Sequence, residues 1–265
     1  MIRTENLSFA YGRDRKILEG LSLSFAEDLN IIIGPNACGK STLLKCLFGL
    51  LNYQGKIFWE DQDLSSLSLE ERSKIMAYLP QGDVRNSSLT VFETVLLGKV
   101  GSLGWKVKGQ QLEEVYQLLD SMKLLPFYNK KIYELSGGQK KLVTIAQTLI
   151  REPQLILMDE PTNNLDIQKQ LELFDMVGQI IEKKKIQFIM VLHDINLSLS
   201  YAHKLIVMSQ GRGVSWGKPD QIISERMLRE VYGIKSSLIE DPHKKPLVVA
   251  QSSVNTIDLF KEKAE

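Results

Sequence analysis

The stretch NIIIGPNACGKST, at residues 30–42, decides the fold of this 265-residue chain. Its first four residues form an apolar strand of the buried type, which runs directly into glycine. Residues 40–50 then have the pattern of a helix, and the loop at residues 34–42 has the spacing GxxxxGK[ST]. A strand, a glycine-rich loop and a helix in this order predict an α/β fold whose loop binds phosphate groups.

The loop residues are the first candidate binding site. Glycine lets the backbone curl so that its N–H groups point at a phosphate, and the start of the next helix adds a favourable dipole. Lys40 is expected to reach the β- and γ-phosphates, and the Ser41 hydroxyl to bind Mg²⁺. The alternative is a glycine-rich turn that caps an ordinary helix, and the strand before the loop argues against it. The expected nucleotide-binding residues are Gly34, Pro35, Asn36, Ala37, Cys38, Gly39, Lys40, Ser41 and Thr42.

Two adjacent carboxylates end a second apolar stretch, LILMDE at residues 155–160. At the carboxyl end of a parallel strand, Asp159 would face a Mg²⁺ ion beside the loop, with water between them. Glu160 comes next and would orient and polarise the attacking water. The alternative is a strand that simply ends in polar residues. The phosphate-binding loop in the same chain favours the catalytic interpretation.

Apolar runs along the rest of the chain indicate its architecture. Leu155–Met158, Phe188–Leu192 and Leu205–Met208 are too continuously apolar for half-exposed strands, so they predict a parallel sheet covered on both faces. Helical stretches lie between them, as in α/β proteins. The opening of the chain is rich in strands, and Leu21–Phe25 alternates cleanly between apolar and polar residues. Amphipathic helix patterns such as Gln110–Met122 follow in the middle of the chain.

Composition narrows the class of protein. Thirty-three basic and 32 acidic residues leave a net charge of +1, which argues against a dedicated nucleic-acid binder. No stretch approaches the roughly 20 apolar residues that cross a bilayer, and the N-terminus has no secretory signal pattern. We therefore expect a soluble, cytoplasmic chain that binds no nucleic acid. The two cysteines, Cys38 and Cys46, are expected to be free thiols.

A third motif, LSGGQ at residues 135–139, opens a helix just before the aspartate strand. Its serine and glycine N–H groups form a second anion-binding helix start. One nucleotide cannot reach both helix starts if they lie far apart in one chain. A head-to-tail pair of chains solves this, because each chain lends its motif to the ATP of the other. The expected binding residues here are Ser136, Gly137, Gly138 and Gln139.

With these motifs in this order, the chain resembles the ATP-binding cassette (ABC) family over nearly its full length. The resemblance implies an ATPase that uses ATP and Mg²⁺. Tyr11 resembles the aromatic residue that stacks on adenine, and Gln81 resembles the glutamine that binds Mg²⁺ and senses the membrane subunit. Asp166, in NNLD, resembles the loop residue near the partner chain, and His193 the histidine that touches the γ-phosphate. The implied catalytic residues are Lys40, Gln81, Glu160 and His193, and the implied Mg²⁺ ligands are Ser41, Gln81 and Asp159.

The sequence departs from the family pattern at two places. Ala37 stands where the loop often has glycine, at a variable position, so we expect little effect. Lys140-Lys141-Leu142 replaces a more usual arginine-rich run after LSGGQ, which removes no catalytic group. His203 and His243 match no motif and are interpreted as structural or surface residues.

The resemblance also implies the domain organisation. We expect one ABC ATPase domain over residues 1–240, followed by a C-terminal tail over residues 241–265. The implied fold is an α/β P-loop NTPase with a mainly parallel core sheet. It has an N-terminal antiparallel β subdomain and an α-helical subdomain inserted at about residues 83–135.

Residues 89–105 and the tail around residues 227–233 resemble a subgroup that energises importers of iron–siderophore, haem and cobalamin complexes. The implied partners are a second copy in an ATP-dependent dimer, separate transmembrane permease subunits and, indirectly, a substrate-binding protein. The permease would dock on residues 81–105, which places the chain peripherally at the cytoplasmic face of the cell membrane. The alternative is a soluble ABC ATPase of cofactor assembly, such as iron–sulfur cluster assembly, that acts on protein partners.

Overall fold

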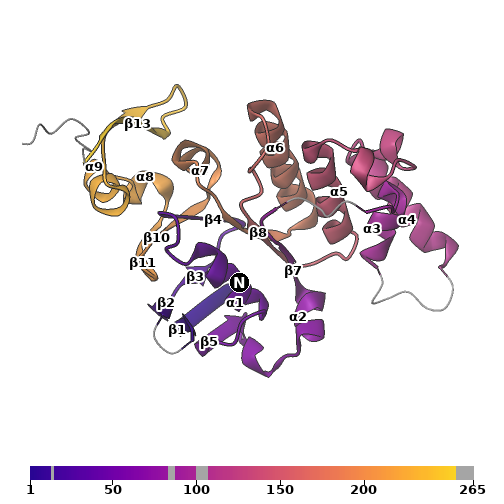
Figure 1. The fold of residues 1–265 in the computed structure, drawn as a ribbon, viewed down its shortest axis with the longest axis horizontal. Helices are drawn as coiled ribbons and strands as arrows, with labels where there is room; N and C mark the ends of the chain where they lie inside the picture. The colour runs from indigo at the N-terminus through magenta and orange to yellow at the C-terminus, as the bar shows by residue number, and fades with distance from the viewer. Residues whose placement is uncertain (13–14, 83–86, 100–106, 255–265) are drawn as a thin grey trace, which may run out of the picture.

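The computed structural model describes residues 1–12, 15–82, 87–99 and 107–254. A central sheet crosses the middle of the molecule, and a smaller N-terminal sheet lies beside it (Figure 1). Helices α3, α4 and α5 gather at one end, and a C-terminal β-hairpin lies at the opposite end. The fold class expected from the sequence is confirmed, with a parallel core sheet, an antiparallel N-terminal sheet and a group of helices.

The central sheet has six strands in the order β11-β10-β4-β9-β8-β7. All neighbours are parallel except β11, which pairs antiparallel with β10. Every residue of β4 and of β8 is buried, because helices or the second sheet cover both faces. The strands are β4 (Leu29–Ile33), β7 (Met76–Leu79), β8 (Leu155–Asp159), β9 (Gln187–Val191), β10 (Lys204–Ser209) and β11 (Arg212–Gly217).

The two faces of this sheet contribute to two different hydrophobic cores. Ile31 and Ile33 of β4 pack in one cluster with Phe174, while Ile32 packs in the other with Leu43. This follows from the period of two along a strand, which sends alternate side chains to opposite faces. The helices over these faces include α1 (Lys40–Phe48), α2 (Leu69–Ile75), α6 (Ile167–Lys184) and α7 (Ile195–Tyr201).

The N-terminal sheet is antiparallel, in the order β2-β1-β5-β6, with β3 also paired to β1. The strand expected over Leu21–Phe25 is divided between β2 and β3, although Leu21, Leu23 and Phe25 are buried as the alternation predicts. Thr4 causes the interruption, since its hydroxyl donates to Leu21 O at 2.9 Å and accepts from Leu23 N at 3.0 Å. The strands are β1 (Ile2–Tyr11), β2 (Arg15–Leu21), β3 (Ser24–Phe25), β5 (Gln54–Trp59) and β6 (Gln62–Asp63); a 3-10 turn, η1 (Leu64–Ser66), follows.

The group of helices has a hydrophobic core of its own. Val91, Val115 and Val143 are buried in it, and they come from three different helices. Helix α5 also contributes Ile145 and Leu149 to the core that contains Phe174, which we call the main core. It therefore connects the group of helices to the central sheet. The limits of about 83–135 for an inserted subdomain stay a prediction. The elements are α3 (Val91–Leu97), α4 (Gly109–Ser121), η3 (Leu125–Phe127), η4 (Ile132–Glu134) and α5 (Gly137–Leu149).

The C-terminal part contains a hairpin that the sequence did not indicate. Strands β12 (Ile234–Glu240) and β13 (Pro246–Ser253) pair antiparallel and lie on either side of the predicted boundary at residue 240, which stays a prediction. Three short helical elements precede the hairpin: α8 (Pro219–Ile222), α9 (Glu225–Met227) and η5 (Leu228–Tyr232). None of the helices in the described part of the chain is long and apolar enough to cross a membrane.

Candidate functional site

The phosphate-binding loop joins the end of β4 to the start of α1. Gly34 has φ 152°, and a Cβ atom there would lie 2.2 Å from the carbonyl oxygen of Met208, so only glycine fits. Ala37 has φ 60°, in the left-handed region that glycine adopts most easily. The Lys40 side chain is buried, and its Nζ donates to Gly34 O and Pro35 O, both at 2.8 Å. The loop lysine is therefore folded onto the carbonyls of its own loop.

A cavity of about 230 Å³ opens over this loop. Tyr11 stands at its edge, 48% exposed, with its ring edge-on to Phe9 at 4.7 Å between centroids. An exposed aromatic face beside a phosphate-binding loop is suited to stacking on a nucleotide base. The residues that line the cavity are Tyr11, Arg15, Ile17, Asn36, Ala37, Gly39, Lys40, Ser41, Thr42, Glu160 and His193.

The carboxylate of Asp159 faces the start of α1. Its Oδ1 accepts from Ser41 Oγ at 2.8 Å, and its Oδ2 accepts from the hydroxyl of Tyr78 at 3.3 Å. Burial raises the pKa of Asp159 above its ordinary value; the Ser41 bond lowers this pKa and the nearby Glu160 raises it. A serine hydroxyl and a carboxylate beside a phosphate site are oxygen ligands of the kind that Mg²⁺ takes, so the donor set fits this ion.

The Glu160 side chain contacts residues from three other segments of the chain. Its Oε2 accepts hydrogen bonds from the side-chain amides of Gln81 and Asn163, and its Oε1 contacts Nε2 of His193. The Glu160 backbone has φ 51°, a left-handed conformation that is strained for a residue with a side chain. The structure thus brings together Glu160, Gln81 and His193, which lie far apart in the sequence.

The LSGGQ motif lies elsewhere. Ser136 caps the start of α5: its Oγ accepts from Gln139 N at 3.3 Å, while the Gln139 side chain accepts from Ser136 N at 3.0 Å. Asp166 caps the start of α6 and accepts from Lys169 N at 2.8 Å. None of the LSGGQ residues, nor Asp166, lines the cavity over the phosphate-binding loop within the described part of the chain. The condition set by the sequence therefore holds for this cavity, since LSGGQ does not line it within the described residues.

Four residues of the site were not predicted as ligands or catalytic groups. Tyr78 contacts Asp159 because β7 and β8 are parallel neighbours, with Tyr78 paired to Leu157. The sequence alone does not show which strands pair, so it could not predict this contact. Asn163 bonds Glu160 from three residues further on. Arg15 and Ile17 line the cavity from β2, and no signal in the sequence marks them.

Comparison with known proteins agrees with this site. The sequence profile of the family described as "ABC transporter" matches residues 18–163. A Bacillus subtilis protein named "probable siderophore transport system ATP-binding protein" is 35% identical over 91% of this chain and 89% of its own length. The iron(3+)-hydroxamate import ATP-binding protein of the same organism is 30% identical over 100% of this chain and 97% of its own length.

A solved ATP-binding cassette of an ABC transporter, in its ADP conformation, superposes with a TM-score of 0.79. It is 29% identical in sequence, and the match covers 88% of this chain and 98% of that structure. A shared profile, relatives of matching length and a shared fold all agree with the loop and carboxylates described above. The chain belongs to the ABC transporter family as one of its ATP-hydrolysing, ATP-binding subunits.

Proposed function

We propose that this chain hydrolyses ATP at the cytoplasmic face of the cell membrane to drive import of a metal chelate through separate permease subunits. The chelate would be of the iron–siderophore, haem or cobalamin class. The observation that carries the ATPase site is the meeting of Glu160, Gln81 and His193 beside the phosphate-binding loop. The substrate class is supported by relatives whose names refer to a siderophore and to iron(3+)-hydroxamate.

In this proposal Mg²⁺ binds with the nucleotide. Ser41 Oγ would coordinate it directly, and Asp159 would hold its water shell, since the two side chains already share a hydrogen bond. Gln81 would bind the ion through its side-chain amide oxygen, which is available because the hydrogen bond to Glu160 uses Nε2. The ion would neutralise charge on the β- and γ-phosphates, and Lys40 would exchange its loop carbonyls for phosphate oxygens.

Glu160 would act on the attacking water. Its carboxylate already contacts three side chains in this structure, those of Gln81, Asn163 and His193. The attacking water would therefore have to replace one of these partners or bind the same oxygen beside it. Of the three partners, His193 also lines the nucleotide cavity, and its ring would contact the γ-phosphate. Phosphoryl transfer gains its rate from such positioning and from charge stabilisation.

A second copy of the chain would complete each site. Ser136, Gly137 and Asp166 are exposed, and so are the neighbouring side chains of Tyr133 at 57% and Ile167 at 76%. Exposed helix starts with adjacent apolar side chains are suited to a contact that closes over a phosphate. We propose a head-to-tail dimer in which the LSGGQ motif of one chain faces the phosphate-binding loop of the other.

The permease would dock at the end formed by α3 and α4. Of the apolar residues in the predicted docking segment, Val91 is core, Phe92 and Leu96 pack against the helical core, and Leu97 is 44% exposed. The other two apolar residues of that segment, Leu103 and Trp105, lie outside the described residues. Side chains at the same end are also exposed, at 36–41%: Val107, Leu112, Tyr116 and Tyr128. This exposed apolar group is larger than a solvated helix face needs.

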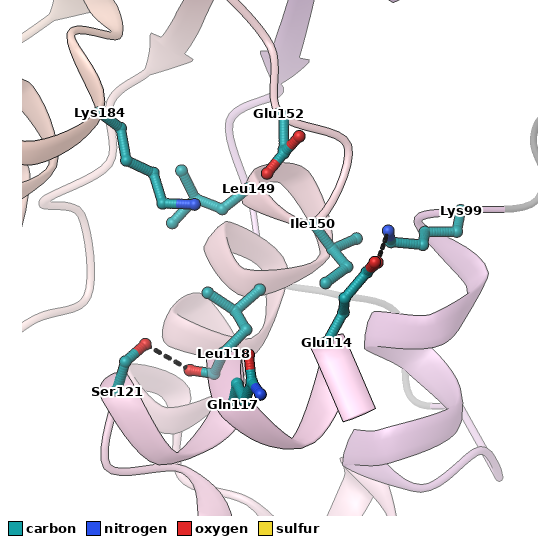
Figure 2. A pocket seen from close by; sticks show the side chains of 9 residues that line it. All are labelled: Lys99, Glu114, Gln117, Leu118, Ser121, Leu149, Ile150, Glu152 and Lys184. Atoms are coloured by element: carbon teal, nitrogen blue, oxygen red, sulfur yellow. Dashed lines mark hydrogen bonds and ion pairs between the residues drawn. The ribbon is translucent and has the colours of Figure 1, made fainter. Parts of the chain in front are cut away.

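A cavity of about 270 Å³ lies next to this end, between α4 and the ends of α5 and α6 (Figure 2). Its floor is apolar, with Leu118, Leu149 and Ile150, and its rim carries the Lys99–Glu114 ion pair. A short helix of a membrane subunit, apolar on one side and polar on the other, fits such a surface. This supports a docking surface distinct from the nucleotide cavity.

The test is uptake of a radiolabelled iron(III)–hydroxamate by cells that lack this chain. The wild-type chain is expected to restore uptake, and Glu160→Gln to restore less than about a hundredth of it, because the anionic carboxylate is lost from the water site. Glu70→Gln is the matched control, since the Glu70 side chain is 84% exposed on α2 and should leave uptake unchanged.

Uptake that does not depend on the chain would contradict the proposal. Purification of the chain with its partners then separates the alternatives. Recovery of a polytopic membrane protein supports the transporter function. Recovery of soluble iron–sulfur assembly proteins alone would favour the cofactor-assembly ATPase in its place.

A further inference from the structure

The C-terminal hairpin is joined to the start of α7 by one side-chain amide. Asn196 Nδ2 donates to Val248 O at 3.1 Å, and Asn196 Oδ1 accepts from Val248 N at 2.8 Å. Strand β13 belongs to a sheet of two strands, so half of its backbone groups point away from β12. Val248 is buried at this free edge, and the Asn196 amide bonds the backbone groups that a neighbouring strand would otherwise bond.

This amide lies in the first turn of α7, three residues after His193. Three residues connect β9 to α7. On the side of the sheet, the connection is fixed by Leu192, which is buried and whose N–H donates to Ile32 O at 3.1 Å. On the side of the helix, Asp194 caps the first turn, since its Oδ1 accepts from Leu197 N at 2.9 Å. The backbone of His193 is therefore held between the sheet and the first turn of α7.

Helix α7 is too short to keep its place without contacts to its neighbours. It has seven residues, whereas isolated helices shorter than about 12 residues are marginal in water. Its C-terminal half is fixed in the main core, where Leu199 is buried and the Tyr201 ring stacks on Phe174 at 4.1 Å between centroids. Its first turn is bonded from outside by Asn196 to β13, which lies beside α7 (Figure 1). Loss of that contact would loosen the end of the helix next to His193.

The position of His193 matters because its ring belongs to the proposed site. The ring contacts Oε1 of Glu160 and lines the nucleotide cavity, and the side chain is 39% exposed. An exposed ring is packed on fewer sides than a core side chain, so its position depends on the backbone that carries it. Phosphoryl transfer gains its rate from such positioning.

We propose that Asn196 is a positioning residue for His193: by binding both backbone groups of Val248, it holds the first turn of α7 so that the His193 ring stays at the nucleotide cavity. The inference rests on the proposed role of His193 in ATP hydrolysis. It also gives the C-terminal hairpin a part in that reaction, although no hairpin residue lines the nucleotide cavity within the described part of the chain.

The test compares Asn196→Ala with the wild-type chain. Single-turnover hydrolysis of Mg-ATP is expected to slow by about tenfold, because a small displacement of a catalytic group costs rate. Affinity for ATP and for ADP, measured by isothermal titration calorimetry, should stay within about twofold of wild type, since the phosphate-binding loop is unchanged. Asn196→Asp keeps the acceptor for Val248 N and loses the donor to Val248 O, so its rate should lie between those of Asn196→Ala and wild type. This second variant carries the test if Asn196→Ala does not fold.

A double variant separates positioning from general loosening of the fold. If Asn196 acts through His193, its replacement has no further effect once the ring is gone. His193→Ala/Asn196→Ala should therefore hydrolyse ATP within about twofold of the rate of His193→Ala alone. A merely structural effect would instead multiply the two losses.

Lys245→Met is the matched control. Lys245 Nζ donates to Ser200 O, so it joins the hairpin to the same helix, but at the end remote from His193. Methionine keeps an unbranched side chain at this position and removes the donor. This variant should hydrolyse ATP at the wild-type rate.

Three results would overturn the inference. A wild-type rate in Asn196→Ala would show that the contact does not position His193. Multiplied losses in the double variant would assign the effect to general loosening of the fold, and so would an equal loss of rate in Lys245→Met. The proposed function fails in a different way: if His193→Ala itself hydrolyses ATP at the wild-type rate, the role of His193 is wrong, and this inference is wrong with it.

Discussion

Glu160 and His193 form one unit within the site. The His193 ring contacts one carboxylate oxygen of Glu160, and Gln81 and Asn163 occupy the other. The Glu160 side chain is only 8% exposed, whereas that of His193 is 39% exposed. The exposed histidine side chain could turn to contact a γ-phosphate while the buried carboxylate, and the strands β8 and β9 that precede the two residues, stay in place.

Replacing His193 should therefore affect turnover more than binding. His193→Ala is expected to lower turnover by roughly a hundredfold, since one positioning contact to the transferring group is lost. Affinity for ADP should stay within about twofold of wild type, because ADP has no γ-phosphate. Single-turnover hydrolysis and calorimetric ADP titration measure the two quantities.

The control for this variant is His203→Ala, which removes a histidine that lies on the surface, outside the site. It should leave both quantities unchanged. A large loss of ADP affinity in His193→Ala, with unchanged turnover of bound ATP, would contradict the role of His193.

The residues of this site differ in how far the sequence could reveal them. Lys40, Ser41 and Asp159 belong to motifs with fixed spacing, and the structure places all three at the cavity or beside it. Tyr78 and Asn163 bond the two carboxylates. No motif contains Tyr78, and Asn163 begins NNLD but was not expected to contact Glu160, because these contacts depend on strand register and on a turn. The sequence therefore identified the motif residues that meet at the cavity, but not Tyr78 and Asn163, and the catalytic roles stay a prediction.

The start of α5 bears on the proposal that LSGGQ acts together with a second copy of the chain. Its capping box uses Ser136 and Gln139 to satisfy two of the backbone groups at the start of α5. Other N–H groups of the first turn stay available for an anion. Because these residues do not line the cavity of their own chain, the ATP that they contact would be that of a second copy.

A mixing experiment tests the shared site. Lys40→Ala removes the charge that holds the phosphates, and Ser136→Arg blocks the start of α5, so each variant alone should have less than about a hundredth of wild-type activity. A mixed dimer contains one site in which both motifs are intact. Up to roughly a quarter of wild-type activity is expected to return in an equal mixture. No return of activity, in mixtures shown to contain the heterodimer, would contradict independent shared sites.

Elements of the fold were predictable where burial is complete. The continuous apolar runs that became β4, β8, β9 and β10 indicated a covered parallel sheet, and the structure has it. The β12–β13 hairpin could not be predicted, because its strands are largely exposed and carry little apolar alternation. The break within residues 21–25 could not be predicted either, since it depends on the Thr4 hydroxyl, which is remote in sequence.

The two proposed binding surfaces and the C-terminal hairpin lie in different parts of the molecule. The nucleotide cavity lies over α1, the exposed apolar group lies around α3 and α4, and the C-terminal hairpin lies at the far end (Figure 1). Helix α5 links the group of helices to the central sheet, since it contributes to the helical core and to the main core. If the permease docks around α3 and α4 as proposed, a change at LSGGQ on α5 would reach it through packed side chains.

In the proposed dimer, ATP is bound between two copies of the chain. The most direct measurement is the mass of Glu160→Gln in solution, by size-exclusion chromatography with light scattering, with and without Mg-ATP. The variant keeps the shape and hydrogen-bonding capacity of Glu160 but loses the anionic carboxylate, so ATP should bind and persist. We predict a mass near 30.1 kDa without nucleotide and about twice that with Mg-ATP. A single-chain mass for protein that carries bound ATP would contradict the claim.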